Sequence, residues 1–152
     1  MKVCLGGTFD TIHKGHKKLI DKAFKTAGTK GSVFIGLSAG KLIDKKQNVK
    51  PWGLRKKELN RYIFDKGHKT DFVIKPINDR FGPTIKKDFD AIIVSPETIK
   101  TAEEINNKRE ELSKKPLKIV KIPYVLADDN MPISSTRVKR KEIDSKGKTI
   151  RD

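Results

Sequence analysis

Residues 2–16, KVCLGGTFDTIHKGH, decide how this chain folds. Lys2 to Leu5 is predicted to be a buried strand, because Val3 to Leu5 is apolar, and the pair Gly6-Gly7 ends it. A helix is predicted from about Lys14, because the apolar residues that follow recur at the spacing of one helical face. These residues are Leu19, Ile20, Ala23, Phe24 and Ala27. The stretch therefore predicts a strand, a glycine-rich turn and an amphipathic helix in direct succession.

Strands and helices keep alternating along the rest of the chain. Strands are predicted at 32–37, 71–77, 91–94 and 117–122, and helices at 52–66, 97–112 and 134–140. We expect one α/β domain over residues 1–152, with a Rossmann-like, open and mostly parallel sheet that carries helices on both faces. A polar tail at about 141–152 is expected to fray. Ligands of such sheets bind at the carboxyl ends of the strands.

The composition favours polyanionic partners without choosing among them. Lys and Arg number 35 against 19 Asp and Glu, which gives a net charge of +16. Nucleic acid, an anionic membrane and phosphorylated small molecules all fit this charge, and so does a merely solvated lysine-rich surface. Only 7% of the residues are aromatic, and no known nucleic-acid motif is visible. The sequence shows no signal peptide or membrane span, so we expect a cytoplasmic protein without a membrane partner.

The loop after the first strand has the composition of an anion site. Gly6-Gly7 lets the backbone approach a ligand closely, and the start of the following helix points free amides at the same place. His13 and His16 lie three residues apart, with Gly15 leaving room between them. Two imidazoles here can donate hydrogen bonds to phosphate oxygens, as nucleotidyl transfer needs when charge builds around the α-phosphorus. The alternatives are an ordinary helix cap and a zinc pair, and zinc lacks further ligands at a recognised spacing.

Two other segments carry candidate phosphate ligands. Ser134-Ser135-Thr136-Arg137 places three hydroxyls and a cation at a predicted helix start, whereas an ordinary cap needs only one serine. Lys50 precedes Pro51, which restrains the backbone at the edge of a long lysine-rich loop. A lysine held there can reach a phosphate as a mobile point charge, although any one lysine of that loop can equally be a solvated side chain.

Two motifs together resemble those of the HxGH nucleotidyltransferases. Gly7-Thr8-Phe9-Asp10-x-x-His13-x-Gly15-His16 is similar to the first motif, and Ile133-Ser134-Ser135-Thr136-Arg137 is similar to the second. Within that superfamily the chain most resembles the phosphopantetheine adenylyltransferases of the archaeal and eukaryotic type, over nearly its whole length. Ser95-Pro96-Glu97-Thr98 stands where the bacterial branch carries an arginine-rich loop.

The resemblance implies a reaction: ATP and 4′-phosphopantetheine give 3′-dephospho-coenzyme A and pyrophosphate, with Mg²⁺ held by the nucleotide phosphates. It implies that Thr8 and Phe9 meet the acceptor phosphate and that Lys50 bridges the two substrates. Lys41, Lys45 and Lys46 are alternatives for that lysine. It implies that His16 stabilises the pentavalent α-phosphate and that His13 supports the nucleotide. The other implied ATP contacts are Gly7, Gly15, Arg109, Ser134, Ser135, Thr136 and Arg137.

Several alternatives stay open at this point. A surface ion pair with Glu110 is an equally good interpretation of Arg109. A sister enzyme could act on nicotinamide mononucleotide, glycerol phosphate or riboflavin phosphate, because such enzymes share the first motif. A basic nucleic-acid-binding module is the alternative from another class, and its binding would depend steeply on salt. The sequence leaves the oligomeric state open.

Overall fold

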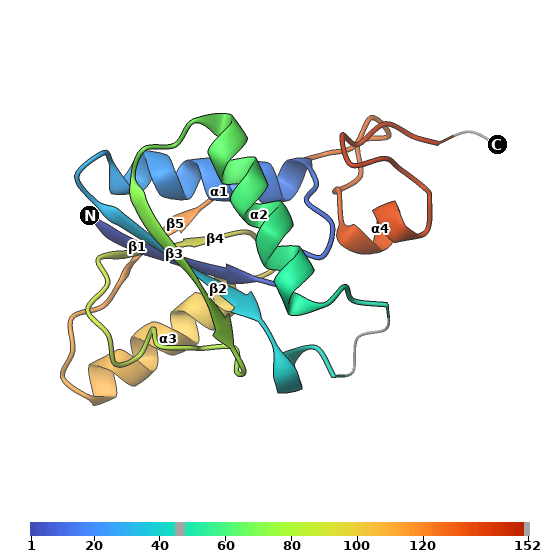
Figure 1. Ribbon diagram of the computed structural model, residues 1–152. Coiled ribbons are helices and arrows are strands. Elements are labelled where there is room, and N and C mark those ends of the chain that lie inside the picture. Colours follow the sequence, from blue (N-terminus) through green and yellow to red (C-terminus); the bar gives the residue numbers. More distant parts are fainter. Residues whose placement is uncertain (45–47, 151–152) are drawn as a thin grey trace.

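Five parallel strands form one sheet in the order β3-β2-β1-β4-β5. They are β1 (Lys2–Gly7), β2 (Ser32–Ser38), β3 (Asp71–Ile77), β4 (Ala91–Val94) and β5 (Lys118–Lys121). The computed structural model describes residues 1–44 and 48–150 (Figure 1). The strand order reverses between β1 and β4, which is where sheets of this kind leave a crevice at the carboxyl ends of their strands.

Helices cover both faces of the sheet. The helices α1 (Lys14–Ala27) and α2 (Trp52–Lys66) pack on one face, and α3 (Ile99–Glu111) packs on the other (Figure 1). Successive side chains of a strand point to opposite faces. Val3 and Leu5 therefore join the core under α1 and α2, whereas Cys4 joins the core under α3. The predicted Rossmann-like α/β fold is confirmed.

Some of the predicted element boundaries were wrong. The first strand continues through Gly6 and Gly7, because both pair in register with β2. The helix predicted at 97–112 begins only at Ile99, because Ser95 to Thr98 form a turn in which the Thr98 hydroxyl accepts the Ser95 backbone N–H. Leu112, the last residue of the predicted helix, lies just past the end of α3 and is 54% exposed.

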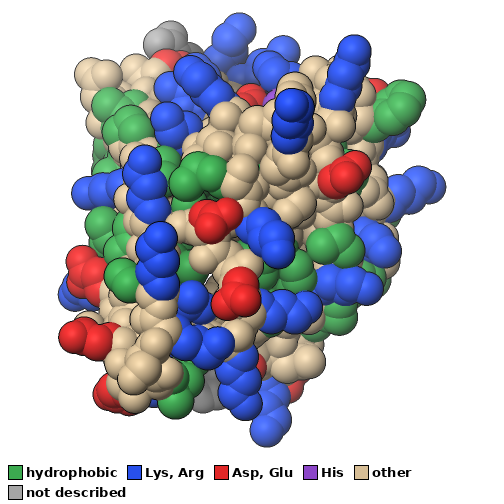
Figure 2. All heavy atoms as spheres, turned by 90° about the vertical axis from the view of Figure 1, so that its left-hand side faces the viewer, with side chains coloured by type: hydrophobic (Ala, Val, Ile, Leu, Met, Phe, Trp, Pro, Cys, Tyr) green, Lys and Arg blue, Asp and Glu red, His purple; other side chains and the backbone are tan. Residues whose placement is uncertain are grey.

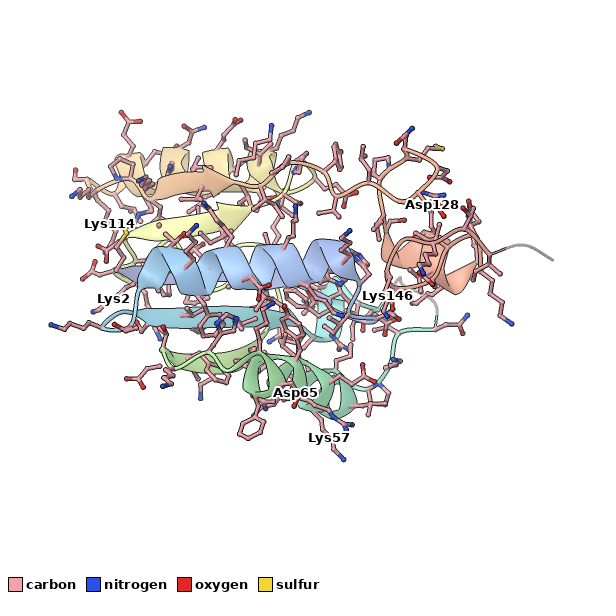
Figure 3. The ribbon with its side chains drawn as sticks, turned by 90° about the horizontal axis from the view of Figure 1, so that it is seen from above. Lys2, Lys57, Asp65, Lys114, Asp128 and Lys146 are labelled. Atoms are coloured by element: carbon pink, nitrogen blue, oxygen red, sulfur yellow. The ribbon has the colours of Figure 1, made fainter. Side chains whose placement is uncertain are left out.

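The segment after the short helix α4 (Ser135–Lys139) does not fray over its described residues. Ile143 is fully buried in a small third core with Ala127 and Ile133. Ile143 also forms a bridge with Thr149, and the Ser145 carbonyl accepts the Lys14 backbone N–H at the start of α1. Seen from above, this unit lies beyond the carboxyl ends of the strands, where Asp128 and Lys146 are labelled (Figure 3). It therefore closes one side of the crevice.

Basic side chains are not confined to the crevice. The opposite end of the molecule, where the strands begin, also carries many scattered Lys and Arg side chains and fewer acidic ones (Figure 2). The net charge alone therefore does not locate a binding site. Within the described part of the chain, no helix is long and apolar enough to span a membrane.

Candidate active site

A cleft of about 900 Å³ lies at the carboxyl ends of the strands. Its walls come from the loop after β1, the first turn of α1, the loops after β4 and β5, and α4. Most of the predicted site residues line it: Gly7, Thr8, Phe9, His13, Gly15, His16, Ser134 and Thr136. The structure thus brings together two segments that lie more than a hundred residues apart in the sequence.

His13 is the N-cap of α1, which fixes the position of its proton. Its Nδ1 accepts the backbone N–H groups of Gly15 (3.0 Å) and His16 (3.3 Å). A nitrogen that accepts two hydrogen bonds carries no proton, so in the neutral ring the proton lies on Nε2. The imidazole lines the cleft and therefore offers Nε2–H as a donor to a ligand.

His16 stacks on His13 and completes a reciprocal capping box. The ring centroids lie 3.7 Å apart at an angle of 17°. The Nδ1 of His16 accepts the His13 backbone N–H at 3.3 Å and lies 3.0 Å from the Thr11 carbonyl oxygen. The first contact needs a lone pair on Nδ1, and the second needs a proton there. The tautomer that accepts from His13 carries its proton on Nε2 and is a donor toward the cleft.

Both histidines are neutral in the substrate-free protein. Burial lowers the pKa of His13 to about 4. Burial and the neighbouring His13 lower the pKa of His16 to about 3, against smaller opposing effects of the Thr11 carbonyl and Asp10. At neutral pH the pair therefore offers hydrogen bonds rather than positive charge.

The depressed pKa values predict that acid destabilises the free protein. The unfolded chain binds protons on these rings near pH 6.5, while the folded chain resists protonation, so their contribution to stability is complete above pH 6.5 and shrinks below it. Between pH 6.5 and 5 the loss should be on the order of 2 kcal/mol for each ring. Urea unfolding at a series of pH values measures it. The control is the double variant His13→Asn, His16→Asn, since asparagine also caps helices. Equal pH slopes for parent and control would contradict the prediction.

Asp10 joins three segments behind the histidines. It is only 3% exposed. One carboxylate oxygen accepts the Lys50 backbone N–H at 2.7 Å, and the other pairs with Lys139 Nζ at 2.5 Å. Burial alone would raise the pKa of Asp10, but the contacts with Lys139 and Lys50 together lower it below its ordinary value. Asp10 is therefore an anion that holds α4 and the Lys50 backbone against the first loop.

The side chain of Lys50 does not line the cleft. Its Nζ pairs with Glu58 at 3.2 Å, and more than a third of each side chain is exposed. Such a pair contributes at most about 1 kcal/mol, so phosphate can readily replace Glu58 as the partner of this ammonium. Lys41 does not line the cleft either. Lys45 and Lys46 lie outside the described residues.

Arg109 requires a correction. It is 3% exposed and, unlike the histidines, is not part of the cleft wall. Its guanidinium donates to the carbonyls of Thr84, Ile85, Lys87 and Lys115, at 2.8 to 3.2 Å. These bonds fasten the loop before β4 to the end of α3. Neither the nucleotide contact nor the surface ion pair with Glu110 describes this residue, because its donors are committed to backbone carbonyls inside the protein.

Arg137 is also engaged elsewhere. Its guanidinium pairs with Asp129, lies 3.6 Å from Glu142 and donates to the carbonyl of Pro132 at 3.0 Å. It holds the turn before α4 and is not part of the cleft wall. The Ser134 hydroxyl accepts the Arg137 backbone N–H as the cap of α4. The side chain of Ser135 lies outside what the structure describes.

Two cations that follow the second motif were not predicted as site residues. Lys139 and Arg140 both line the cleft. They follow Thr136 by three and four residues, and on a helix this spacing puts all three on one face. The helical spacing from Thr136 is therefore the sequence signal that indicates Lys139 and Arg140. Lys139 also donates to the Asn48 carbonyl at 3.3 Å, so it bridges α4 and the loop that holds Lys50.

The described residues contain no group of three or more His, Cys, Asp or Glu placed to hold a metal ion. Asp10, the buried carboxylate in the cleft, is already engaged by Lys50 and Lys139. Cys4 is buried away from the loop, and burial raises the pKa of its thiol to about 12. The thiol is therefore protonated and unreactive.

Comparison with known proteins agrees with this geometry. The model of the family described as cytidylyltransferase-like matches residues 4–141. A phosphopantetheine adenylyltransferase of Methanosarcina mazei is 47% identical over 148 residues, which cover 97% of this chain and 96% of that protein. One from Archaeoglobus fulgidus is 43% identical over 99% of this chain and 100% of its own.

A solved structure is also similar to this chain in sequence and fold. A crystal structure of a protein of unknown function from Archaeoglobus fulgidus is 41% identical, with a TM-score of 0.71, over 80% of this chain and 89% of that one. The match to the family model runs across both motifs and the sheet between them. The chain therefore belongs to the cytidylyltransferase-like family, among the archaeal relatives named phosphopantetheine adenylyltransferase.

Proposed function

We propose that this protein transfers the adenylyl group of ATP to 4′-phosphopantetheine, giving 3′-dephospho-coenzyme A and pyrophosphate. The observation that carries the proposal is the stacked His13–His16 pair, which lines the same cleft as Ser134, Thr136 and Lys139. The names of the archaeal relatives supply the acceptor. A sister acceptor would need the same phosphate machinery, so its exclusion rests on these relatives and on the assay below.

The transfer is a direct displacement at the α-phosphorus. A phosphate oxygen of the acceptor forms a bond to the α-phosphorus, the bond to the β-phosphate oxygen breaks, and the electron pair leaves with pyrophosphate. The Nε2–H groups of His13 and His16 would donate to the oxygens on which charge builds. Lys139 would meet the outer phosphates, and Lys50 would exchange Glu58 for the phosphates of both substrates. Thr8 and Phe9 would hold the acceptor phosphate.

Mg²⁺ fits this site as an ion brought in by the nucleotide. The described residues form no cage for it, and phosphate and water oxygens are the ligands that Mg²⁺ prefers. When bound, it would offset the charge of the triphosphate. A cytoplasmic location, where ATP is available, completes the proposal.

An acceptor panel tests the proposal. The purified protein, ATP and Mg²⁺ are combined with 4′-phosphopantetheine, nicotinamide mononucleotide, glycerol phosphate or riboflavin phosphate, and pyrophosphate release is measured. We expect release with 4′-phosphopantetheine at a rate at least a hundredfold above that with the other three. Faster pyrophosphate release with another acceptor would show that the proposed acceptor is wrong, while adenylyl transfer itself would still stand. Retention of a labelled adenylyl group on the protein after incubation with ATP alone would contradict direct displacement.

A further inference from the structure

Arg55 is a fully buried cation behind the active-site loops. It lies in the first turn of α2, and its exposed fraction is 0%. It is not part of the cleft wall, so it has no surface to offer a ligand in the cleft. Burying a guanidinium is costly unless its donors are satisfied. Its position therefore calls for a reason beyond packing.

The guanidinium gathers three carbonyl groups from three segments. Nη1 donates to the carbonyls of Thr8 (3.0 Å) and Ser38 (2.9 Å), and Nε donates to that of Lys50 (2.8 Å). These carbonyls belong to the loop after β1, the end of β2 and the residue pair that leads into α2. One side chain thus fixes the relative positions of the segments that present the predicted acceptor ligands.

The contact with Thr8 determines where the next backbone N–H points. The Thr8 carbonyl and the Phe9 N–H belong to one peptide unit, and every described peptide bond of the chain is trans. In a trans unit the N–H points away from the carbonyl. Because the carbonyl faces Arg55, the Phe9 N–H faces away from it. Phe9 has a φ of 46°, a conformation that side chains other than glycine rarely adopt, so this orientation needs an outside anchor.

The backbone of Lys50 is held from two sides. Its N–H donates to the Asp10 carboxylate at 2.7 Å, and its carbonyl accepts from Arg55 Nε at 2.8 Å. Its side chain, by contrast, is more than a third exposed. A fixed backbone with a free ammonium suits a lysine that must reach two substrates from one place.

One donor of Arg55 is left over. Its Nη2 is buried and has no hydrogen-bond partner in the part of the chain that the structure describes. The protein therefore tolerates an unsatisfied polar atom in order to keep a guanidinium here. A residue selected for packing alone would avoid that cost.

We propose that Arg55 is a positioning residue for adenylyl transfer: by holding the Thr8 and Lys50 carbonyls, it aims the Phe9 N–H and the Lys50 side chain at the acceptor phosphate. This inference rests on the proposed function. It places the effect of Arg55 on the acceptor rather than on ATP, because the histidines and α4 are not among its partners.

The variant Arg55→Lys tests the proposal, because it keeps the charge and removes the planar fork that reaches three carbonyls. We expect kcat/KM for 4′-phosphopantetheine to fall roughly tenfold or more, the scale of a small misplacement of reacting groups. The dissociation constant of ATP should stay within about twofold. The control is Tyr62→Phe, also on α2, which loses the hydrogen bonds from its hydroxyl to Asp21 far from the cleft. It should lower the thermal midpoint without changing kcat/KM.

A kcat/KM within twofold of the parent, or an equal loss of ATP affinity, would overturn the proposal. If the parent protein shows no transfer to 4′-phosphopantetheine, the proposed function fails. Backbone amide hydrogen exchange then tests the positioning role of Arg55 independently of activity. Faster exchange over residues 7–10 in Arg55→Lys than in Tyr62→Phe supports the positioning role, and equal exchange contradicts it. If Arg55→Lys does not fold, hydrogen exchange at Arg55 in the parent protein tests the proposal instead. The Arg55 Nε–H should exchange more slowly with 4′-phosphopantetheine bound, and an unchanged rate counts against the proposal.

Discussion

Replacing His16 with alanine is expected to lower the turnover number roughly a hundredfold or more, the usual effect of removing one preorganised donor from a developing charge. His16 lines the cleft and stacks on His13, so its ring is held in place before any substrate arrives. The affinity for ATP should change much less, because the hydrogen bond strengthens as the α-phosphorus becomes pentavalent. Steady-state kinetics and equilibrium titration of ATP measure the two effects separately.

Folding of the His16→Ala protein should survive. The variant loses one half of a capping box, and such a contact contributes about 1 kcal/mol. His16→Asn is the matched variant, since an amide N–H can replace a neutral imidazole donor, and it should keep more activity than alanine. Near-normal turnover of His16→Ala, with a thermal midpoint lowered only by the lost cap, would mean that His16 only caps α1.

Gly15→Ala is expected to lower turnover about tenfold or more by displacing the His13 ring. A Cβ at Gly15 would lie 2.8 Å from His13 Cε1 and 3.0 Å from Nδ1. The ring cannot easily move aside, because its Nδ1 holds the backbone N–H groups of Gly15 and His16. The substitution therefore moves a candidate catalytic donor without deleting it. Turnover and the thermal midpoint are the measurements.

Gly53→Ala is the matched control. Gly53 occupies the second position of α2, as Gly15 does in α1, and a Cβ there would meet nothing within 4 Å. Alanine in place of a helical glycine should stabilise the protein by about 0.5–1 kcal/mol without changing turnover. If Gly15→Ala also kept full turnover, the close packing of Gly15 on His13 would have no catalytic role.

The fold was predictable because its periodic signals are strong and local. The apolar run Ala91–Val94 is buried along its whole length, as a central parallel strand requires. The tail was mispredicted because its core is built from single apolar residues, such as Ile143, whose partners Ala127 and Ile133 lie in the loop before α4 rather than on one periodic face. Spacing along the chain carries no signal for such a contact.

The residues that line the cleft were predictable where the backbone determines their position, and were not predictable where long cationic side chains are involved. His13, Gly15 and His16 follow directly from the start of a helix after a glycine-rich loop. Arg109 and Arg137 are long side chains whose reach allows several partners, and each found carbonyls or carboxylates in the protein instead of the cleft. Arg55 gave no sequence signal, because a basic residue on a helix is usually solvated, and its partners come from three separate segments.

Product identification tests the central claim most directly. The parent and the His16→Ala protein are each incubated with ATP, Mg²⁺ and 4′-phosphopantetheine, and the products are identified by mass spectrometry. The parent should form 3′-dephospho-coenzyme A and pyrophosphate in equal amounts, and His16→Ala should form both at about a hundredth of that rate. A parent protein that forms neither product, or two proteins that form them at the same rate, would contradict adenylyl transfer at the His13–His16 site.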